Sequence, residues 1–269
     1  MNLQAALAMY LAPPEAVQDF WAAVAALLRA DTADTACASL PLPAAPSWPE
    51  DLHAHWQEPT VLLSQTCGYP LTTQLHGKVQ LVGTFAYTAP GVQGIYCRSQ
   101  LICRQHDARN TLAAFANSRL AYNDTRSQSG YNALRALVAD HTRQRPFFAS
   151  SVCTGGHYRS IAAVLTGQAD MAAVDPVSLA HWQRSNPHSA AELRVFGQTD
   201  AYPGLPLITA LPTAAPVLVA LRRALHTLAH DAAYTALRQP LLISGFVETT
   251  LADYQVCITM QQRAAGLVL

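Results

Sequence analysis

The chain carries hydroxyl side chains at a point where a strand is expected to give way to a helix. Ser127 and Ser129, followed by Gly130, come after the short apolar run 120–122 and lead into a helix-patterned segment. The first N–H groups of a helix have no intrahelical partner and carry the positive end of its dipole. Hydroxyls and a glycine at this place predict a cradle for a phosphate-like anion. An ordinary serine N-cap without a ligand is the structural alternative.

Two further predicted strand ends carry polar residues of the same kind. The strand-like segment 147–153 is followed by Gly155, Gly156 and then His157 at an expected helix start. The glycines permit close backbone approach, and His157 can donate a hydrogen bond to an oxyanion. The third segment, 171–174, ends at Asp175, whose carboxylate can accept from a protonated ligand oxygen or an amine. A surface histidine and an aspartate N-cap are the structural alternatives for these two residues.

Strands and helices that position these residues are expected to alternate along the chain. Predicted strands cover 3–11, 60–64, 79–87, 93–104, 119–122, 147–153, 171–174, 193–198 and 207–211, with a short extended piece around 36–40. Helices are predicted from Pro14 onward, over 129–140, 157–167 and 176–184, along the stripe 217–228, and around 231–238 and 250–264. This alternation predicts an α/β fold with a doubly wound parallel sheet. Ligands of such sheets bind beyond the carboxyl ends of the strands.

Composition excludes several classes of function. The 269 residues are 51% hydrophobic, and Lys+Arg equals Asp+Glu at 17 each, so nucleic acid is not an expected partner. The sequence has no apolar run long enough for a membrane span. Six cysteines lack Cys-x-x-Cys and zinc spacing, which predicts free thiols, no metal and no cofactor. The N-terminus lacks a secretory pattern, so we expect either a cytoplasmic protein or one whose export signal has been removed.

Three blocks carry a resemblance to a known family. They read Asn-Asp-x-x-Ser-x-Ser-Gly-Tyr at 123–131, Thr-Gly-Gly-His-x-x-Ser-Ile-x-Ala-Val at 154–164 and Gly-Gln-Ala-Asp-Met-Ala-Ala-Val-Asp at 167–175. Together with 62–71, 203–206 and 243–246, they resemble the phosphonate, phosphite and phosphate substrate-binding proteins of ABC importers. The resemblance implies the type II periplasmic-binding-protein fold, a small oxyanion ligand, an ABC permease partner and a periplasmic location. We expect a monomer.

The fold of that family implies two lobes that close on the ligand like a jaw. Mapped onto this sequence, lobe 1 covers 1–85 plus 204–269, and lobe 2 covers 90–198. Hinge strands that cross between the lobes are expected at about 82–87 and 196–202.

The resemblance also implies site residues. Ser127, Gln128 and Ser129 match the family's oxyanion-binding cluster, His157 matches its phosphonate-contacting histidine, and Asp175 matches an acidic residue near the ligand. The aromatic positions that cover the pocket match Tyr69 and, more loosely, Tyr87 and Tyr96. The lobe 1 candidates for the other side of the pocket are Gln65 and Thr66.

The sequence departs from the family at two points. Gln128 stands where many relatives carry a small hydroxyl residue. No acid between Asp175 and Asp200 matches the one that reads an aminoalkyl tail. Phosphate, phosphite, a simple phosphonate or another small organic oxyanion is therefore favoured over an aminophosphonate.

Two other classes of protein share this fold. A cytoplasmic enzyme acting on a small carboxylated metabolite is the first alternative, with Cys153 and His157 as the pair to test. The sequence shows no Gly-x-Ser-x-Gly motif and no P-loop that would support it. A ligand-sensing domain is the second alternative, and it would need a DNA-binding partner chain.

Overall fold

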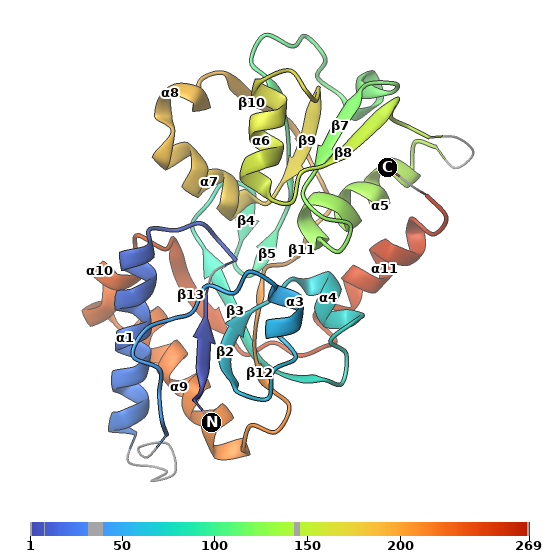
Figure 1. Ribbon diagram of the computed structural model, residues 1–269. Helices are drawn as coiled ribbons and strands as arrows, with labels where there is room; N and C mark the ends of the chain where they lie inside the picture. The colour runs from blue at the N-terminus through green and yellow to red at the C-terminus, as the bar shows by residue number, and fades with distance from the viewer. Residues whose placement is uncertain (1, 8, 32–39, 143–145, 268) are drawn as a thin grey trace.

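Two five-stranded sheets divide the molecule into two lobes (Figure 1). The computed structural model describes residues 2–7, 9–31, 40–142, 146–267 and 269. We call the elements packed on the first sheet lobe 1 and those packed on the second sheet lobe 2. The expected two-lobed α/β fold is confirmed, whereas the predicted lobe boundaries stay predictions.

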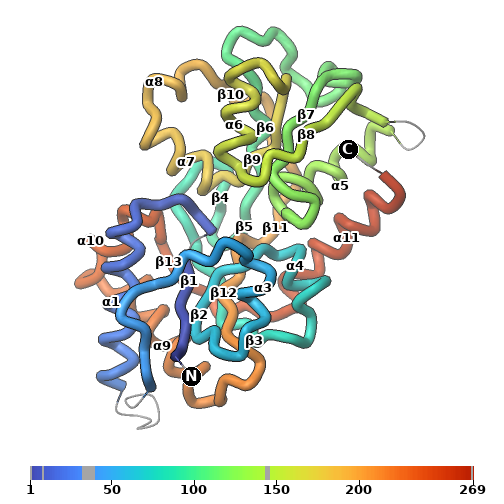
Figure 2. The backbone as a smooth tube through the Cα atoms, in the orientation of Figure 1, coloured from blue at the N-terminus to red at the C-terminus, as the bar shows by residue number. Residues whose placement is uncertain are grey.

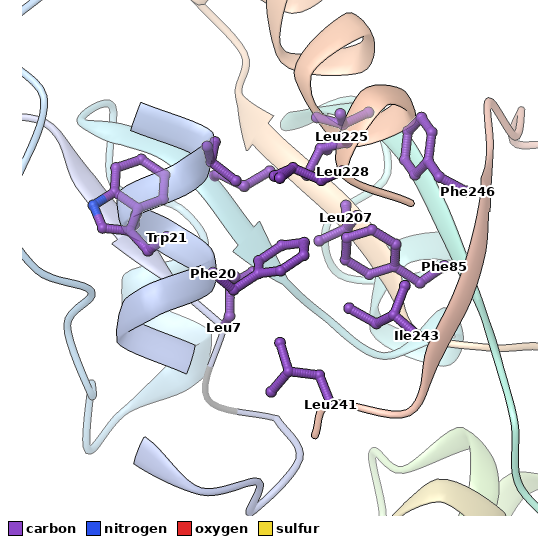
Figure 3. Close-up of a cluster of buried hydrophobic side chains, with 14 of the residues drawn as sticks. Leu7, Phe20, Trp21, Phe85, Leu207, Leu225, Leu228, Leu241, Ile243 and Phe246 are labelled. Carbon is purple, nitrogen blue, oxygen red and sulfur yellow. The ribbon is translucent and has the colours of Figure 1, made fainter. Parts of the chain in front are cut away.

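The sheet of lobe 1 has the order β1-β2-β12-β3-β13. Its strands are β1 (Gln4–Ala6), β2 (Val61–Gln65), β12 (Pro206–Ala210), β3 (Val79–Tyr87) and β13 (Ile243–Val247). One face is covered by α1 (Pro14–Ala30) and α9 (Ala215–His230), and the apolar residues between them include Phe20, Phe85 and Leu207 (Figure 3). On the other face lie α3 (Leu52–His55), α4 (Gly68–Thr72) and α11 (Gln255–Arg263). Two short helices, η3 (Ala232–Tyr234) and α10 (Thr235–Arg238), follow α9.

Spacing of apolar residues explains why α1 forms and where it packs. Pro14 occupies the first turn, where a missing N–H costs nothing. Val17, Phe20, Trp21, Val24 and Leu28 recur at intervals of three or four residues, and all are buried.

The sheet of lobe 2 has the order β10-β6-β9-β7-β8. Its strands are β10 (Leu193–Gln198), β6 (Gln100–Arg104), β9 (Met171–Val174), β7 (Arg119–Tyr122) and β8 (Ser150–Cys153). One face packs against η1 (Leu112–Phe115) and α5 (Ala133–Ala139), which the π-helical turn η2 (Gln128–Asn132) precedes. On the other face lie α6 (His157–Leu165) and α7 (Pro176–Ser185), and α8 (Pro187–Ala190) follows them.

Both sheets are mixed, so the expectation of a wholly parallel sheet is wrong. β8, β7 and β9 run parallel to one another, but β6 is antiparallel to β9 and β10 is antiparallel to β6. In lobe 1, β12 runs antiparallel to both of its neighbours, β2 and β3. β13 is likewise antiparallel to its neighbour β3, so β12 and β13 run against β1, β2 and β3.

The chain crosses between the lobes twice (Figure 2). It leaves β3 for β6 through β4 (Val92–Gln93) and β5 (Tyr96–Cys97), and it returns from β10 to β12 through β11 (Tyr202–Pro203). These three short strands form a small sheet of their own. The single strand predicted over 93–104 is therefore divided, and Gly94 turns the chain between β4 and β5 with a φ of 59°.

The remaining expectations differ mainly at the ends of elements. The strands predicted over 79–87, 119–122, 171–174 and 193–198 are confirmed with those bounds. The first strand ends at Ala6 rather than Leu11, and the strand predicted over 147–153 begins at Ser150. Of the extended piece predicted around 36–40, residues 36–39 lie outside the described residues. No helix within the described ranges has the length and apolar character needed to cross a membrane.

The helix α11 contacts elements of both lobes. It packs against α4 of lobe 1 and against α5 of lobe 2. Arg263 near its end pairs with Asp140, and also with Asp200 at 2.7 Å. Residues beyond 250 thus follow lobe 1 in sequence but also contact α5 of lobe 2, where Arg263 pairs with the residue that ends the helix.

Candidate functional site

Three helices of lobe 2 begin at the same edge of its sheet. β8, β7 and β9 are neighbouring parallel strands, so their carboxyl ends meet there. The segments after them start η2 at Gln128, α6 at His157 and α7 at Pro176. Ser127, His157 and Asp175 are therefore brought together, as the order of the three sequence blocks predicts.

Ser127 and Ser129 lie at the first of these helix starts. Ser127 is the N-cap of η2, and its Oγ accepts a hydrogen bond from the N–H of Gly130 at 3.1 Å. The two hydroxyl oxygens lie 3.4 Å apart, and both residues are buried. Ser127 is thus a structural cap, yet its hydroxyl also faces the cleft described below.

His157 is the first residue of α6 and contacts Ser129. Its Nε2 lies 2.9 Å from Ser129 Oγ and 3.4 Å from Asn123 Nδ2. Burial lowers the pKa of the imidazole to about 4, so the ring is neutral near pH 7. The helix start adds further donors, because the first helical hydrogen bond of α6 runs from the N–H of Ser160 to Gly156.

Asp175 is the N-cap of α7 and is only 2% exposed. Its Oδ1 accepts from the N–H groups of Val177 and Ser178, both at 2.9 Å. Burial nevertheless raises the pKa of the carboxyl to about 6, because these hydrogen bonds offset only part of the lost solvation. Both the cap interpretation and the cleft interpretation therefore hold for this residue, since it also lines the cleft.

A cleft of about 730 Å³ lies between the lobes at this edge. Ser127, Ser129, His157 and Asp175 line it from lobe 2, and Tyr10, Trp56 and Cys67 line it from lobe 1. Two hydrogen bonds join the lobes beside it. The N–H of Gln128 donates to Cys67 Sγ at 3.1 Å, and the Tyr158 hydroxyl donates to the Leu11 carbonyl at 3.4 Å.

Gln128 and Gly130 support the hydroxyl pair from behind. Gln128 is 1% exposed, and its side-chain amide contacts Met260 Sδ at 3.1 Å and Asn132 Nδ2 at 2.8 Å, away from the residues lining the cleft. A Cβ on Gly130 would lie 2.0 Å from Asn123 Oδ1 and 3.1 Å from His157 Cε1. The absence of a side chain at Gly130 therefore lets His157 approach Ser129.

The residues predicted from lobe 1 and the hinge do not line this cleft. Gln65 donates to the Tyr87 hydroxyl at 3.0 Å, and both residues line a separate small cavity inside lobe 1. Thr66 is fully buried after β2. Tyr69 lies in α4, and Tyr96 is 46% exposed on β5. The structure thus groups four of the predicted lobe 2 residues at the cleft and separates them from these five; the predicted Gln128 and Gly130 do not line the cleft either.

Tyr10 and Cys67 are cleft residues that the sequence prediction missed. Tyr10 follows β1, and no spacing signal distinguishes it from the surrounding apolar run. Cys67 lies inside the segment 62–71 that carries the family resemblance, but that resemblance points to Tyr69, two residues further along. Burial raises the pKa of the Cys67 thiol to about 11, so the thiol is neutral. The charged residues at the cleft include Arg126, paired with Asp124 at 2.9 Å, and Arg159.

Ser129 and His157 lie as close together as a catalytic nucleophile and its base, but the pKa of the histidine does not suit a base. A catalytic base works best with a pKa near the operating pH, whereas burial brings that of His157 to about 4. Its Nδ1 is buried and has no hydrogen-bond partner among the described residues, so no carboxylate orients the ring. Cys153 is exposed, and its Sγ contacts the Asn123 carbonyl. The arrangement therefore suits hydrogen bonding to an anion.

Metal binding is not indicated by the side chains around the cleft. Within the described part of the chain, no group of three or more His, Cys, Asp or Glu residues has a spacing that could hold a metal ion.

A model of a known family matches most of the chain. The model of the family described as "ABC transporter, phosphonate, periplasmic substrate-binding protein" matches residues 61–254. That range includes Ser127, Ser129, His157 and Asp175. No curated protein matches the chain by sequence.

Solved structures with a similar fold include three two-lobed proteins. A binding-protein component of an ABC phosphonate transporter from Pseudomonas aeruginosa has a TM-score of 0.76 and 14% identity, covering 98% of this chain and 86% of that one. PhnD1 from Prochlorococcus marinus, in complex with methylphosphonate, has a TM-score of 0.75 and 11% identity, with 97% of each chain covered. XAC2383 from Xanthomonas citri, bound to ATP, has a TM-score of 0.70 and 16% identity, covering 100% and 99%. At these identities the likeness shows the fold.

The histidine at the start of α6 allows a pH prediction. Its pKa is lowered from 6.5 to about 4, so the folded protein binds fewer protons at His157 than the unfolded chain between these values. The stability that this residue contributes is therefore complete above pH 6.5 and is lost as the pH falls through that window. NMR titration of the imidazoles, with His157→Gln to assign the resonance, should show a midpoint near 4. A midpoint near 6.5 would mean that the ring is solvated, against the geometry above.

Proposed function

Because the chain belongs to the family of phosphonate periplasmic substrate-binding proteins of ABC transporters, we propose that it binds phosphate, phosphite or a simple phosphonate in the interlobe cleft. Members of this family are substrate-binding components of a transporter, not enzymes, and the family is periplasmic. For this chain we likewise propose a periplasmic location, a permease partner and a monomeric state.

The observation that carries the proposal is the meeting of three helix starts at one side of the cleft. Backbone N–H groups at helix starts, the hydroxyls of Ser127 and Ser129, and the imidazole of His157 all lie at that edge. An anion placed there would receive hydrogen bonds from several donors fixed by the fold.

The donors at this edge are neutral, which suits a buried anion that must also be released. The imidazole is uncharged because burial lowers its pKa, and the Cys67 thiol is uncharged because burial raises its pKa. A dianion buried without compensation would be very costly, and fixed dipoles supply that compensation without a permanent ion pair.

Asp175 favours an oxyanion that carries a proton. Its carboxylate is buried at the cleft wall and can accept a hydrogen bond from a P–O–H group. Phosphate, phosphite and phosphonates can hold such a proton near neutral pH, whereas sulfate cannot. The cleft of about 730 Å³ leaves room for an organic substituent beside the oxyanion. The methylphosphonate complex of PhnD1 and the ATP complex of XAC2383 show that proteins of this fold take ligands of different sizes.

A thermal-shift screen tests the proposal. The purified chain is melted with phosphate, phosphite, methylphosphonate, sulfate and small carboxylates. A ligand that binds the folded state stabilises it by RT ln(1 + [L]/Kd), so the melting temperature rises with the logarithm of the ligand's excess over Kd. Stabilisation by at least one phosphorus oxyanion supports the proposal. Stabilisation by a carboxylated metabolite alone would contradict it.

The two serines should each contribute to affinity. We expect Ser127→Ala and Ser129→Ala to weaken binding of the oxyanion by about 1–3 kcal/mol each, since each leaves a buried partner unsatisfied. That is roughly a 5- to 150-fold rise in Kd, measured by isothermal titration calorimetry. Ser150→Ala, at an exposed position on β8, is the matched control and should bind like the wild type. Unchanged affinity in both cleft variants would refute the site.

Asp175 should exclude sulfate. A sulfate oxygen and the Asp175 carboxylate would face each other with no proton between them. We therefore expect sulfate to bind at least roughly tenfold more weakly than the best phosphorus oxyanion, a loss of about 1.4 kcal/mol in binding free energy. Asp175→Asn keeps a good N-cap residue for α7 but replaces one acceptor by an N–H donor. Calorimetry should therefore find a smaller preference against sulfate in this variant. Equal affinity of the wild type for sulfate and for the phosphorus oxyanion would show that Asp175 does not select for a protonated ligand oxygen.

A further inference from the structure

A small cavity of about 30 Å³ lies in lobe 1 beside α7 of lobe 2, next to the cleft. Most of its wall is apolar, and Leu7, Phe20, Phe85, Leu241 and Ile243 around it belong to the buried cluster between the sheet and its helices (Figure 3). Tyr10 is shared by the cavity wall and the cleft wall. An apolar void of this kind is usually dry.

Two polar atoms make this cavity different from an apolar void. The Tyr10 hydroxyl and His181 Nε2 are buried, and neither has a hydrogen-bond partner among the described residues. Tyr10 is 5% exposed and His181 is 3% exposed, and both side chains line the cavity. Their rings are 6.4 Å apart between centroids, so they are neighbours without a direct hydrogen bond.

Their protonation states define what a partner must offer. Burial lowers the pKa of His181, so the ring is neutral. The hydrogen bond with the Leu241 backbone therefore uses the other ring nitrogen, Nδ1. A backbone carbonyl accepts, so Nδ1 carries the proton. Nε2 is then an acceptor that lacks a donor. Burial also raises the pKa of Tyr10, so its hydroxyl keeps a proton to donate and a lone pair to accept.

A second polar pair faces the same space. The Tyr87 hydroxyl accepts from Gln65 Nε2 at 3.0 Å, and both side chains line the cavity. Since Tyr87 uses only an acceptor position in that bond, its own proton is still available. The cavity therefore presents one acceptor and two hydroxyl donors around a space of about 30 Å³.

We propose that this cavity is a hydration site, in which one or two water molecules join Tyr10 of lobe 1 to His181 of α7. A water molecule can donate to His181 Nε2 and at the same time accept from a tyrosine hydroxyl. The volume is sufficient, because a cavity needs only about 10–15 Å³ on this measure to hold a water. Water with this many partners is part of the structure.

The site lies where α7 meets lobe 1. Val177 of α7 belongs to the apolar cluster of lobe 1, and His181 lies one turn further along the same helix. Asp175, which caps α7, lines the ligand cleft. The proposed water thus lies in the contact between α7 and lobe 1. This role is independent of which ligand the cleft binds.

A high-resolution crystal structure tests the site directly. We expect density for water at about 2.7–3.2 Å from both Tyr10 Oη and His181 Nε2. Three results would overturn the proposal: a cavity without density, a direct hydrogen bond between the two side chains, or a ligand substituent that fills the cavity.

A double-mutant cycle gives the second test. Tyr10→Phe and His181→Leu each leave the water with fewer partners, so each should lower the melting temperature by about 2–4 °C. The double variant makes these two walls apolar, and we expect it to lose less than the sum of the single losses. Tyr96→Phe, at an exposed tyrosine, is the matched control and should melt like the wild type. Strictly additive losses would show that Tyr10 and His181 share no partner.

Discussion

Backbone N–H groups that lack an intrahelical partner, at the starts of three lobe 2 helices, are the constraint on which the site depends. They meet because β8, β7 and β9 are adjacent parallel strands whose carboxyl ends share an edge. At two of the starts the protein satisfies donors itself, through Ser127 at η2 and Asp175 at α7. At η2, the thiol of Cys67 comes from the other lobe to accept the N–H of Gln128. Donors at the edge of an interlobe cleft are thus fixed before any ligand arrives.

Burial then sets the charge of every titratable group around those donors. It keeps the imidazole of His157 and the thiol of Cys67 neutral, and it raises the pKa of Asp175 to about 6. The start of each lobe 2 helix at the cleft therefore offers neutral donors or the buried carboxyl group of Asp175, while the charged Arg126 is paired with Asp124. Such a site favours a small anion with a proton over one without. It also explains why the contact between Ser129 and His157 belongs to a binding protein and does not make an enzyme.

Local sequence was enough to predict that Ser127, His157 and Asp175 follow strands that end at one edge of a sheet, because each strand end and the residue following it lie within one short block. Tertiary contacts decided the rest. Gln128 lies between Ser127 and Ser129, but its side chain contacts Met260, which is 132 positions away. Gln65 and Tyr87 bond each other across β2 and β3 and so face an inner cavity. Tyr10 and Cys67 reach the cleft only because the lobes fold against each other. The strand directions of the mixed sheets are likewise not revealed by alternation along the chain.

The most direct measurement is a crystal structure of the protein with methylphosphonate or phosphite. We expect the oxyanion in the interlobe cleft, within hydrogen-bond distance of the Ser129 hydroxyl, the His157 imidazole and the backbone N–H groups that begin α6. An oxyanion bound elsewhere, or bound in the cleft through Arg126 and Arg159 without contact to Ser129 and His157, would contradict it.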